Sequence, residues 1–232
     1  MKTLLAIPLV LMSLASFPSW GTDLEKGLTA WQSGDFATAV REWTPLAKQG
    51  NASAQYYLGL MYDNGDGVLQ DYKTAIKWYT LAAEQGLASA QYNLGLMYYN
   101  GDGVLQDYKT AVKWYTLAAE QGYASAQYNL GVIYDNGDGV LQDYKTALKW
   151  YTLAAEQGHA AAQTNLGVMY ALGQGVIKDN VYAHMWANIA SSNGDEDGGK
   201  FRELVAKEMT QSQLEEAQAL ARKCVAKSYK DC

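Results

Sequence analysis

Few residues of this chain have the types and spacing that catalysis or metal binding needs. The two histidines, His159 and His184, lie in different parts of the chain, and neither has a Cys or His neighbour at metal-ligand spacing. Three serines recur at a fixed interval, Ser53, Ser89 and Ser125, without a His or Lys partner in register. The sequence contains no S-x-x-K, S-D-N, K-T-G or G-x-S-x-G motif. We therefore interpret the serines as helix caps and predict no catalytic residue, no metal site and no cofactor.

One acidic turn superficially resembles a calcium-binding loop. It reads DNGDG from Asp63 to Gly67, so Gly65 falls where the third position of an EF-hand needs an oxygen ligand, and no Glu closes the loop. Asn and Gly tolerate the positive φ angles of a tight turn. We therefore expect a solvent-facing turn here rather than a cation site.

These residues belong to a repeated unit. The stretch 51–86 (NASAQYYLGLMYDNGDGVLQDYKTAIKWYTLAAEQG) recurs almost unchanged as 87–122 and 123–158, and more loosely as 159–194. A fixed period of this length with two apolar segments per unit is typical of a helical solenoid. We predict an all-α superhelix of tandem 36-residue helix-turn-helix repeats. It is flanked by a divergent N-terminal capping repeat at 22–50 and a C-terminal helical cap at 195–232.

Each unit is predicted to form two helices joined by a turn. The first helix covers about 53–64, and Asp71 can cap the second. Gly59 lies inside the first helix, where glycine costs about 1 kcal/mol relative to alanine. Because this cost recurs in every unit, we expect two helices to cross there too closely for a side chain. One tryptophan recurs on each second helix, and we interpret it as packing between neighbouring units, with contact to a partner as the alternative: Trp78, Trp114, Trp150 and Trp186.

One pattern of residues carries a family resemblance. In the first full copy it reads Ala54-Gln55-x-x-Leu58-Gly59-x-x-Tyr62-x-x-Gly65-x-Gly67-Val68, followed by Asp71, Ala75, Trp78-Tyr79, Ala82-Ala83 and Gly86. This pattern resembles the Sel-one-like repeat, a relative of the tetratricopeptide repeat, and the resemblance covers essentially residues 22–194. It implies a right-handed αα-superhelix whose concave face binds proteins or peptides, and it implies no single ligand.

The last 38 residues, 195–232, depart from the repeat. We expect a polar, glycine-containing link at 195–199 and an amphipathic helix near 200–207. A further helix is predicted to start at Thr210, which forms a capping box with Gln213. We interpret this segment as a cap that covers the last repeat.

The first 21 residues, 1–21, read as a secretory signal peptide. Lys2 supplies a positive charge, and 4–14 is an apolar run too short to span a bilayer comfortably. We predict cleavage after Gly21, with cleavage after Ala15 as the alternative, and an uncleaved membrane anchor as the competing interpretation. The mature protein is then periplasmic or secreted, without stable membrane insertion.

Cys224 and Cys232 are the only cysteines. A pair of cysteines in an exported chain favours an intramolecular disulfide, which would tie the tail back to the last helix. Closing so short a loop contributes about 2–3 kcal/mol on the entropic account.

The charge balance argues against nucleic acid as a partner. The chain has 18 Lys and Arg against 24 Asp and Glu, a net charge of −6, and no basic stripe in its repeats. Phosphate binding needs clustered cations. We predict a protein or peptide partner instead, and a monomer.

The strongest candidate surface lies on the first helix of each unit. Tyr56 and Asp63 are seven residues apart and therefore nearly aligned, opposite the apolar side of the helix. In the related tetratricopeptide fold this helix lines the inner groove, and its asparagines bind a peptide backbone, so the resemblance implies the same role here. The alternative is that the asparagines bridge adjacent helices. The candidate residues are Tyr56, Asp63, Tyr92, Asn93, Tyr99, Tyr128, Asn129, Asp135 and Asn165.

Three functions follow from these observations. The favoured one is an exported scaffold or adaptor that binds proteins or extended peptides in its concave groove, in the cell envelope or at a host interface. The second is an envelope hydrolase acting on β-lactams or peptidoglycan, an activity described for some exported members of the family. The third is a structural spacer with no ligand in the groove.

Overall fold

The computed structural model describes residues 20–232, and over this range the chain forms twelve α-helices and no strand. The predicted signal peptide therefore lies outside the described residues except for its last two positions, which begin the first helix. The all-α prediction is confirmed. The helices are α1 (Trp20–Gln32), α2 (Phe36–Lys48), α3 (Ala52–Asn64), α4 (Tyr72–Glu84), α5 (Ala88–Asn100), α6 (Tyr108–Glu120), α7 (Ala124–Asn136), α8 (Tyr144–Ala155), α9 (Ala160–Leu172), α10 (Asn180–Ser192), α11 (Glu196–Ala206) and α12 (Gln211–Ala226).

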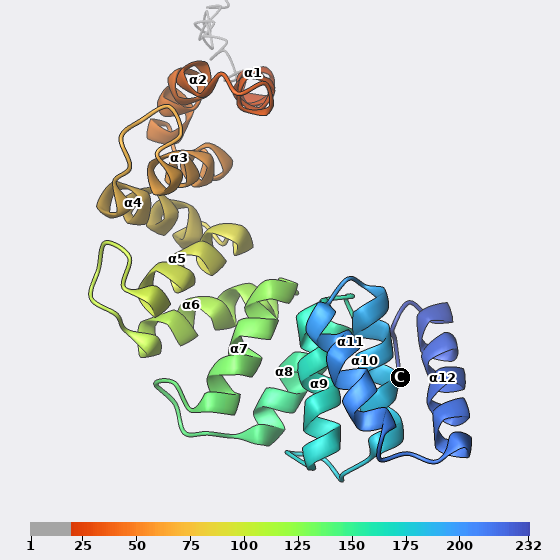
Figure 1. Cartoon of the computed structure of the whole chain (residues 1–232). Helices are drawn as coiled ribbons and strands as arrows, with labels where there is room; N and C mark the ends of the chain where they lie inside the picture. The colour runs from red at the N-terminus through yellow and green to blue at the C-terminus, as the bar shows by residue number, and fades with distance from the viewer. Residues whose placement is uncertain (1–19) are drawn as a thin grey trace, which may run out of the picture.

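Each helix packs mainly against its neighbours in the chain. The pairs α3–α4, α5–α6, α7–α8 and α9–α10 are the four repeats, and α1–α2 precedes them. Figure 1 shows the pairs stacked along a curved path from α1 to the C-terminal helices. At the far end α10 contacts both α11 and α12, so these two helices cover the last repeat. The fold is an α-solenoid.

The buried layers lie between units rather than within one. The layer between the first two full repeats combines residues of α4 and α5, and Trp114 of the next helix packs against its edge. Trp78 and Trp150 pack in the same way against the layers before them, which confirms that these tryptophans join neighbouring units. A single unit therefore cannot bury its own apolar face, as expected for a solenoid. The buried residues of the layer between α4 and α5 are Ala75, Tyr79, Ala82, Ala83, Ala90, Leu94 and Met97.

Two glycines of each unit are required by close approach. A Cβ atom on Gly59 would lie 2.5 Å from the ring of Tyr79, so the predicted tight crossing of α3 and α4 is confirmed. Gly67, in the turn after α3, has a φ of +70°, and a Cβ atom there would lie 2.7 Å from the backbone of Phe36. The turn therefore rests on the start of the second helix of the preceding unit.

Capping follows the prediction for the second helix of each unit but not for the first. The Asp71 carboxylate accepts from the amides of Lys73 at 3.0 Å and Thr74 at 3.2 Å, and so caps α4. The prediction that the recurrent serines cap the first helices is wrong, because each serine is already the second helical residue. Asn51 caps α3 instead, and α5 and α7 have no side-chain cap.

A row of buried amides joins each unit to the one before it, and we call it the glutamine ladder. Gln91 is 4% exposed; its Nε2 donates to the carbonyl of Ala83 at 3.1 Å, and its Oε1 accepts from Gln121 Nε2 at 2.7 Å. Both polar ends of the buried side chain are thereby satisfied. The same arrangement recurs in the other repeats with the pairs Gln55–Gln85, Gln127–Gln157 and Gln163–Asn193.

The first helix of the C-terminal cap begins earlier than the sequence predicts, at Glu196 instead of near residue 200. The expected link at 195–199 is wrong: α11 starts at Glu196, and Asp195 caps it. Gly198 is buried, and a Cβ atom there would lie 2.7 Å from Thr164 Oγ1 and 2.8 Å from Ala190 Cβ. Close packing on α9 and α10, rather than flexibility, explains this glycine. The predicted capping box at the start of α12 is present.

Candidate functional site

The nine candidate residues lie on α3, α5, α7 and α9 and are all half-buried. We call this set the helix-A face; its members are Tyr56, Asp63, Tyr92, Asn93, Tyr99, Tyr128, Asn129, Asp135 and Asn165. They gather around one buried tyrosine on the second helix of each of the first three repeats. We call these three buried residues, Tyr79, Tyr115 and Tyr151, the tyrosine nodes. In the sequence these tyrosines belong to the apolar stripe of the second helix, which predicts packing in the core and no polar role.

The hydroxyl of the first node has both a hydrogen-bond acceptor and a hydrogen-bond donor. Tyr79 Oη donates to Asp63 Oδ2 at 3.1 Å and accepts from Asn93 Nδ2 at 3.2 Å. The ring of Tyr56 lies over the same tyrosine, with ring centroids 6.0 Å apart. Asn93 therefore joins α4 to α5, which is the bridging role that the sequence left open. An amide has two N–H donors and a carbonyl, so this one bond leaves further capacity.

The third node repeats the carboxylate bond and the ring contact of the first. Tyr151 Oη donates to Asp135 Oδ2 at 3.4 Å, and the ring of Tyr128 lies 6.0 Å from it. Burial raises the pKa of Tyr151, and so does the Asp135 carboxylate, whereas the neighbouring Asn165 lowers it. Tyr128 also stacks on His159, with centroids 4.6 Å apart. The phenol thus stays protonated and acts as a donor to the carboxylate.

The middle node differs from the other two. Tyr99 occupies the position that Asp63 and Asp135 hold in the neighbouring repeats, and its hydroxyl donates to Asp138 Oδ2 at 3.2 Å. Tyr115 is 0% exposed, and its hydroxyl has no hydrogen-bond partner. Burial raises the pKa of Tyr115, against a smaller opposite effect of Asn129, so the group is a protonated and unpaired donor.

Tyr115 is one of the residues that line a cavity of about 190 Å³ between α5 and α7. Its wall combines aliphatic side chains, tyrosine rings and two amides, without a lysine or arginine. The lining residues are Leu96, Tyr99, Asn100, Tyr115, Tyr128, Asn129 and Val132.

The two carboxyl groups of the helix-A face have raised pKa values because they are half-buried. Burial raises the pKa of Asp63, and the Asp102 carboxylate adds to this effect, while the bond from Tyr79 lowers it. Burial also raises the pKa of Asp135. Two carboxyl groups therefore lie half-buried beside aromatic rings, where burial disfavours their charged form.

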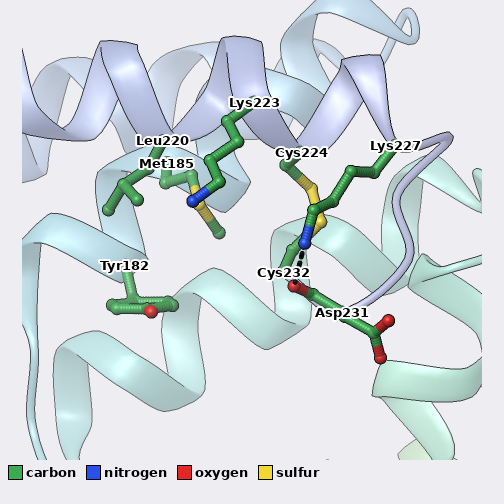
Figure 2. Close-up of a pocket in the computed structure, with 8 residues that line it drawn as sticks. All are labelled: Tyr182, Met185, Leu220, Lys223, Cys224, Lys227, Asp231 and Cys232. Atoms are coloured by element: carbon green, nitrogen blue, oxygen red, sulfur yellow. Dashed lines mark hydrogen bonds between the residues drawn. A yellow bond between two sulfur atoms is a disulfide. The ribbon is translucent and has the colours of Figure 1, made fainter.

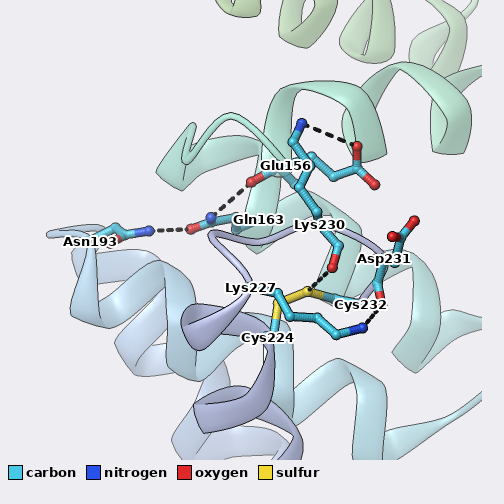
Figure 3. The surroundings of a disulfide bond; sticks show 9 residues. Glu156, Gln163, Asn193, Cys224, Lys227, Lys230, Asp231 and Cys232 are labelled. Atoms are coloured by element: carbon cyan, nitrogen blue, oxygen red, sulfur yellow. Dashed lines mark hydrogen bonds and ion pairs between the residues drawn. A yellow bond between two sulfur atoms is a disulfide. The ribbon is translucent and has the colours of Figure 1, made fainter.

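A second cavity lies beneath the C-terminal helix. It measures about 130 Å³, and Figure 2 shows Lys223 and Lys227 reaching from α12 toward it. Cys224 and Cys232 are joined by a disulfide across a Cα–Cα distance of 5.3 Å. Beside the disulfide, Lys230 reaches Glu156, the residue directly after α8, at 3.6 Å, as Figure 3 shows. The tail therefore runs back over the last repeats. Formation of this disulfide in the native protein stays a prediction.

The turns of the repeats present a separate, apolar feature. One aliphatic side chain per turn is almost fully exposed, at 87–91%. Such a row was not identified in the sequence, because an exposed leucine has no local signal that distinguishes it from a buried one. The residues are Leu69, Leu105, Leu141 and Ile177.

Among residues 20–232 no three His, Cys, Asp or Glu side chains lie close enough together to hold a metal ion. No helix in that range is both long and apolar enough to cross a membrane. His159 instead caps α9 by accepting from the Ala162 amide at 3.3 Å.

Fold and surface together define a tandem helical-repeat protein whose polar groups converge on one helix of each unit. The Sel1 repeat model matches residues 52–87, 88–123, 124–159 and 160–195, which is more than half of the chain. The chain belongs to the Sel1 repeat family. Proteins of this family generally act as scaffolds for protein–protein interaction and are typically not enzymes.

Among the solved structures similar to this chain are two that share 37% identity with it. The first is c5321, a protective antigen of uropathogenic Escherichia coli, with 37% identity and a TM-score of 0.81 over 89% of this chain. The match spans only 46% of that protein, which is therefore the longer of the two. The second is a Sel1 repeat protein of Oxalobacter formigenes, with 37% identity and a TM-score of 0.73 over 77% of this chain and 74% of that one. Comparison with curated proteins gives no match.

Proposed function

We propose that this protein is an exported adaptor that binds an extended peptide, or an extended segment of a protein, along the helix-A face. The observation that carries the proposal is the repetition of tyrosine, asparagine and aspartate groups at the same place on successive units. Such a surface offers similar contacts at regular spacing, which suits an extended chain better than a compact small molecule.

The chemistry of the helix-A face supports a polypeptide ligand. Asparagine amides both donate to and accept from a peptide backbone, and half-exposed tyrosine rings bury apolar area at low entropic cost. The alternatives have less support. No serine of the chain has an activating partner in its sequence, which speaks against the hydrolase, and a spacer has no need of a repeated polar face.

Export rests on the amino-terminal sequence alone. The positive charge at Lys2 and the apolar run at 4–14 have the form of a secretory signal. A disulfide between Cys224 and Cys232 fits the oxidising compartments outside the cytoplasm.

Photo-crosslinking in the cells that make the protein tests the binding surface. One variant carries a photoreactive phenylalanine at Asn136, which is exposed at the end of α7 on the helix-A side. The matched control carries it at Leu141, which is exposed at the tip of the following turn. We expect a defined protein adduct from position 136 and none from position 141. An adduct from position 141 alone would move the binding surface to the turns, and no adduct from either would favour the spacer.

A further inference from the structure

The cavity between α5 and α7 lies where one repeat departs from its neighbours. In the first and third repeats a carboxylate accepts the hydrogen of the tyrosine node, at 3.1 Å from Asp63 and 3.4 Å from Asp135. In the middle repeat Tyr99 stands at that position and donates its own hydroxyl elsewhere. The buried Tyr115 hydroxyl is left as a donor without an acceptor. A buried donor of this kind costs free energy until something supplies an oxygen.

The missing group is an acceptor, and this restricts what can complete the site. The N–H groups of Asn129 cannot replace it, because a phenol hydrogen needs a lone pair. A carboxylate is disfavoured as well, since no cation lines the cavity and Asp138 already lies beside Tyr99 at 3.2 Å. A neutral carbonyl oxygen meets both conditions.

The rest of the wall specifies what the carbonyl is attached to. Leu96 and Val132 offer an apolar wall for an aliphatic stem, while Asn100 and Asn129 add two side-chain amides, a group whose carbonyl can accept from an N–H. One water needs about 10–15 Å³ of such space, so a cavity of about 190 Å³ holds a side chain of several heavy atoms. An aliphatic stem that ends in a primary amide matches this wall in every part.

We propose that this cavity is a specificity pocket for a glutamine or asparagine side chain of the peptide ligand, whose carbonyl oxygen accepts from the Tyr115 hydroxyl. The proposal rests on the proposed function, that the helix-A face binds an extended peptide. It adds the chemical identity of one ligand side chain and the repeat that reads it. The neighbouring repeats, whose nodes are already satisfied, bind the peptide without this selectivity.

The test uses small probes and therefore needs no natural partner. The full chain is labelled with ¹³C in its tyrosine rings and titrated with N-acetyl-glutamine N-methylamide in an NMR experiment. We expect saturable shifts of the Tyr115 and Tyr128 ring signals. The glutamate derivative, which carries a carboxylate, and the norleucine derivative, which has no amide, are expected to bind at least tenfold more weakly. Equal binding of all three probes, or no saturable shift with the glutamine probe, would overturn the proposal.

Two variants locate the effect. Tyr99→Asp supplies the acceptor that the other repeats have, and Tyr115→Phe removes the donor; each is expected to weaken the glutamine probe at least tenfold. Leu141→Ser, in an exposed turn, serves as the control and should leave affinity unchanged. Unchanged affinity in Tyr99→Asp would contradict the proposal, and circular dichroism of the variant establishes that it is folded.

The crosslinking experiment separates this inference from the function on which it rests. If the adduct at position 136 forms but the glutamine probe gives no saturable shift at Tyr115, peptide binding stands and the specificity pocket is wrong. If the glutamine probe binds at Tyr115 but no adduct forms in cells, the amide site stands and the proposed function is wrong.

Discussion

The three tyrosine nodes make a matched set for measuring what one hydroxyl contributes. Tyr79, Tyr115 and Tyr151 occupy the same position in successive repeats and are all buried at 0–1% exposure. They differ in whether the hydroxyl has an acceptor. Replacing each in turn by phenylalanine removes a single oxygen atom and keeps the ring, so the packing of the core layer is preserved.

The expected effects follow from the partners of each hydroxyl. Tyr79→Phe removes a bond to a half-buried carboxylate at 3.1 Å and a bond from Asn93 at 3.2 Å. A bond to a charged group contributes about 1.5–3 kcal/mol and a neutral one about 1 kcal/mol, and partial exposure of Asp63 reduces the first. We expect Tyr79→Phe to destabilise the protein by about 2 kcal/mol. Tyr115→Phe removes an unpaired donor and should be neutral or stabilising by about 1 kcal/mol.

Urea denaturation of the wild type and the three variants, side by side at pH 7, provides the comparison. The order of stability should be Tyr115→Phe first, then Tyr151→Phe, whose bond is longer at 3.4 Å, and Tyr79→Phe last. Because a solenoid unfolds approximately as a sum of units, hydrogen exchange in the affected repeat serves as a second readout. If Tyr115→Phe lost as much stability as Tyr79→Phe, the middle hydroxyl would have a partner and the reasoning would fail.

Three further predictions concern other parts of the chain. Gly59→Ala should lower stability by about 1 kcal/mol, because the clash with the Tyr79 ring outweighs the gain in helix propensity, and a thermal melt measures it. Burial lowers the pKa of His159 from 6.5, so the folded state binds fewer protons than the unfolded one and stability falls as the pH drops below about 6.5. His159→Asn keeps a capping side chain and should reduce this pH dependence; an unaltered pH profile would assign it elsewhere. Alkylation of the native protein should label neither Cys224 nor Cys232 until a reductant is added. Two free thiols before reduction would show that the predicted disulfide does not form.

The sequence predicts the architecture well because repetition reinforces every local signal. Asp71 caps its helix through its own neighbours, and Gly59 is identified by a cost that recurs in each unit. The start of α11 is not predicted from the sequence, because it depends on a tertiary contact that no repeated local signal reveals. The sequence places Gly198 in a polar, glycine-containing link, whereas packing against Thr164 and Ala190 makes it a helical residue. Tertiary contact overrides propensity there, and no local pattern shows it.

The candidate surface was predicted only in part. Its nine residues do lie together, but the nodes that organise them are tyrosines which read as ordinary apolar residues in a helical stripe. Position 99 was visible as one of the few that differ between copies. Whether Tyr99 leaves the Tyr115 hydroxyl without an acceptor depends on how two helices pack. The sequence alone does not show that an aspartate at this position accepts a hydrogen bond from the tyrosine node.

The glutamine ladder bears on how a protein of this kind changes length. Each joint is made by two side-chain amides and one backbone carbonyl at equivalent positions. Excision of one whole unit, such as 87–122, would therefore bring Gln127 to the Ala83 carbonyl, which now accepts from Gln91. Duplication of a unit would likewise create a joint in which every buried amide finds its partner. The number of units can therefore change without a redesign of the buried core, because every joint repeats the same contacts.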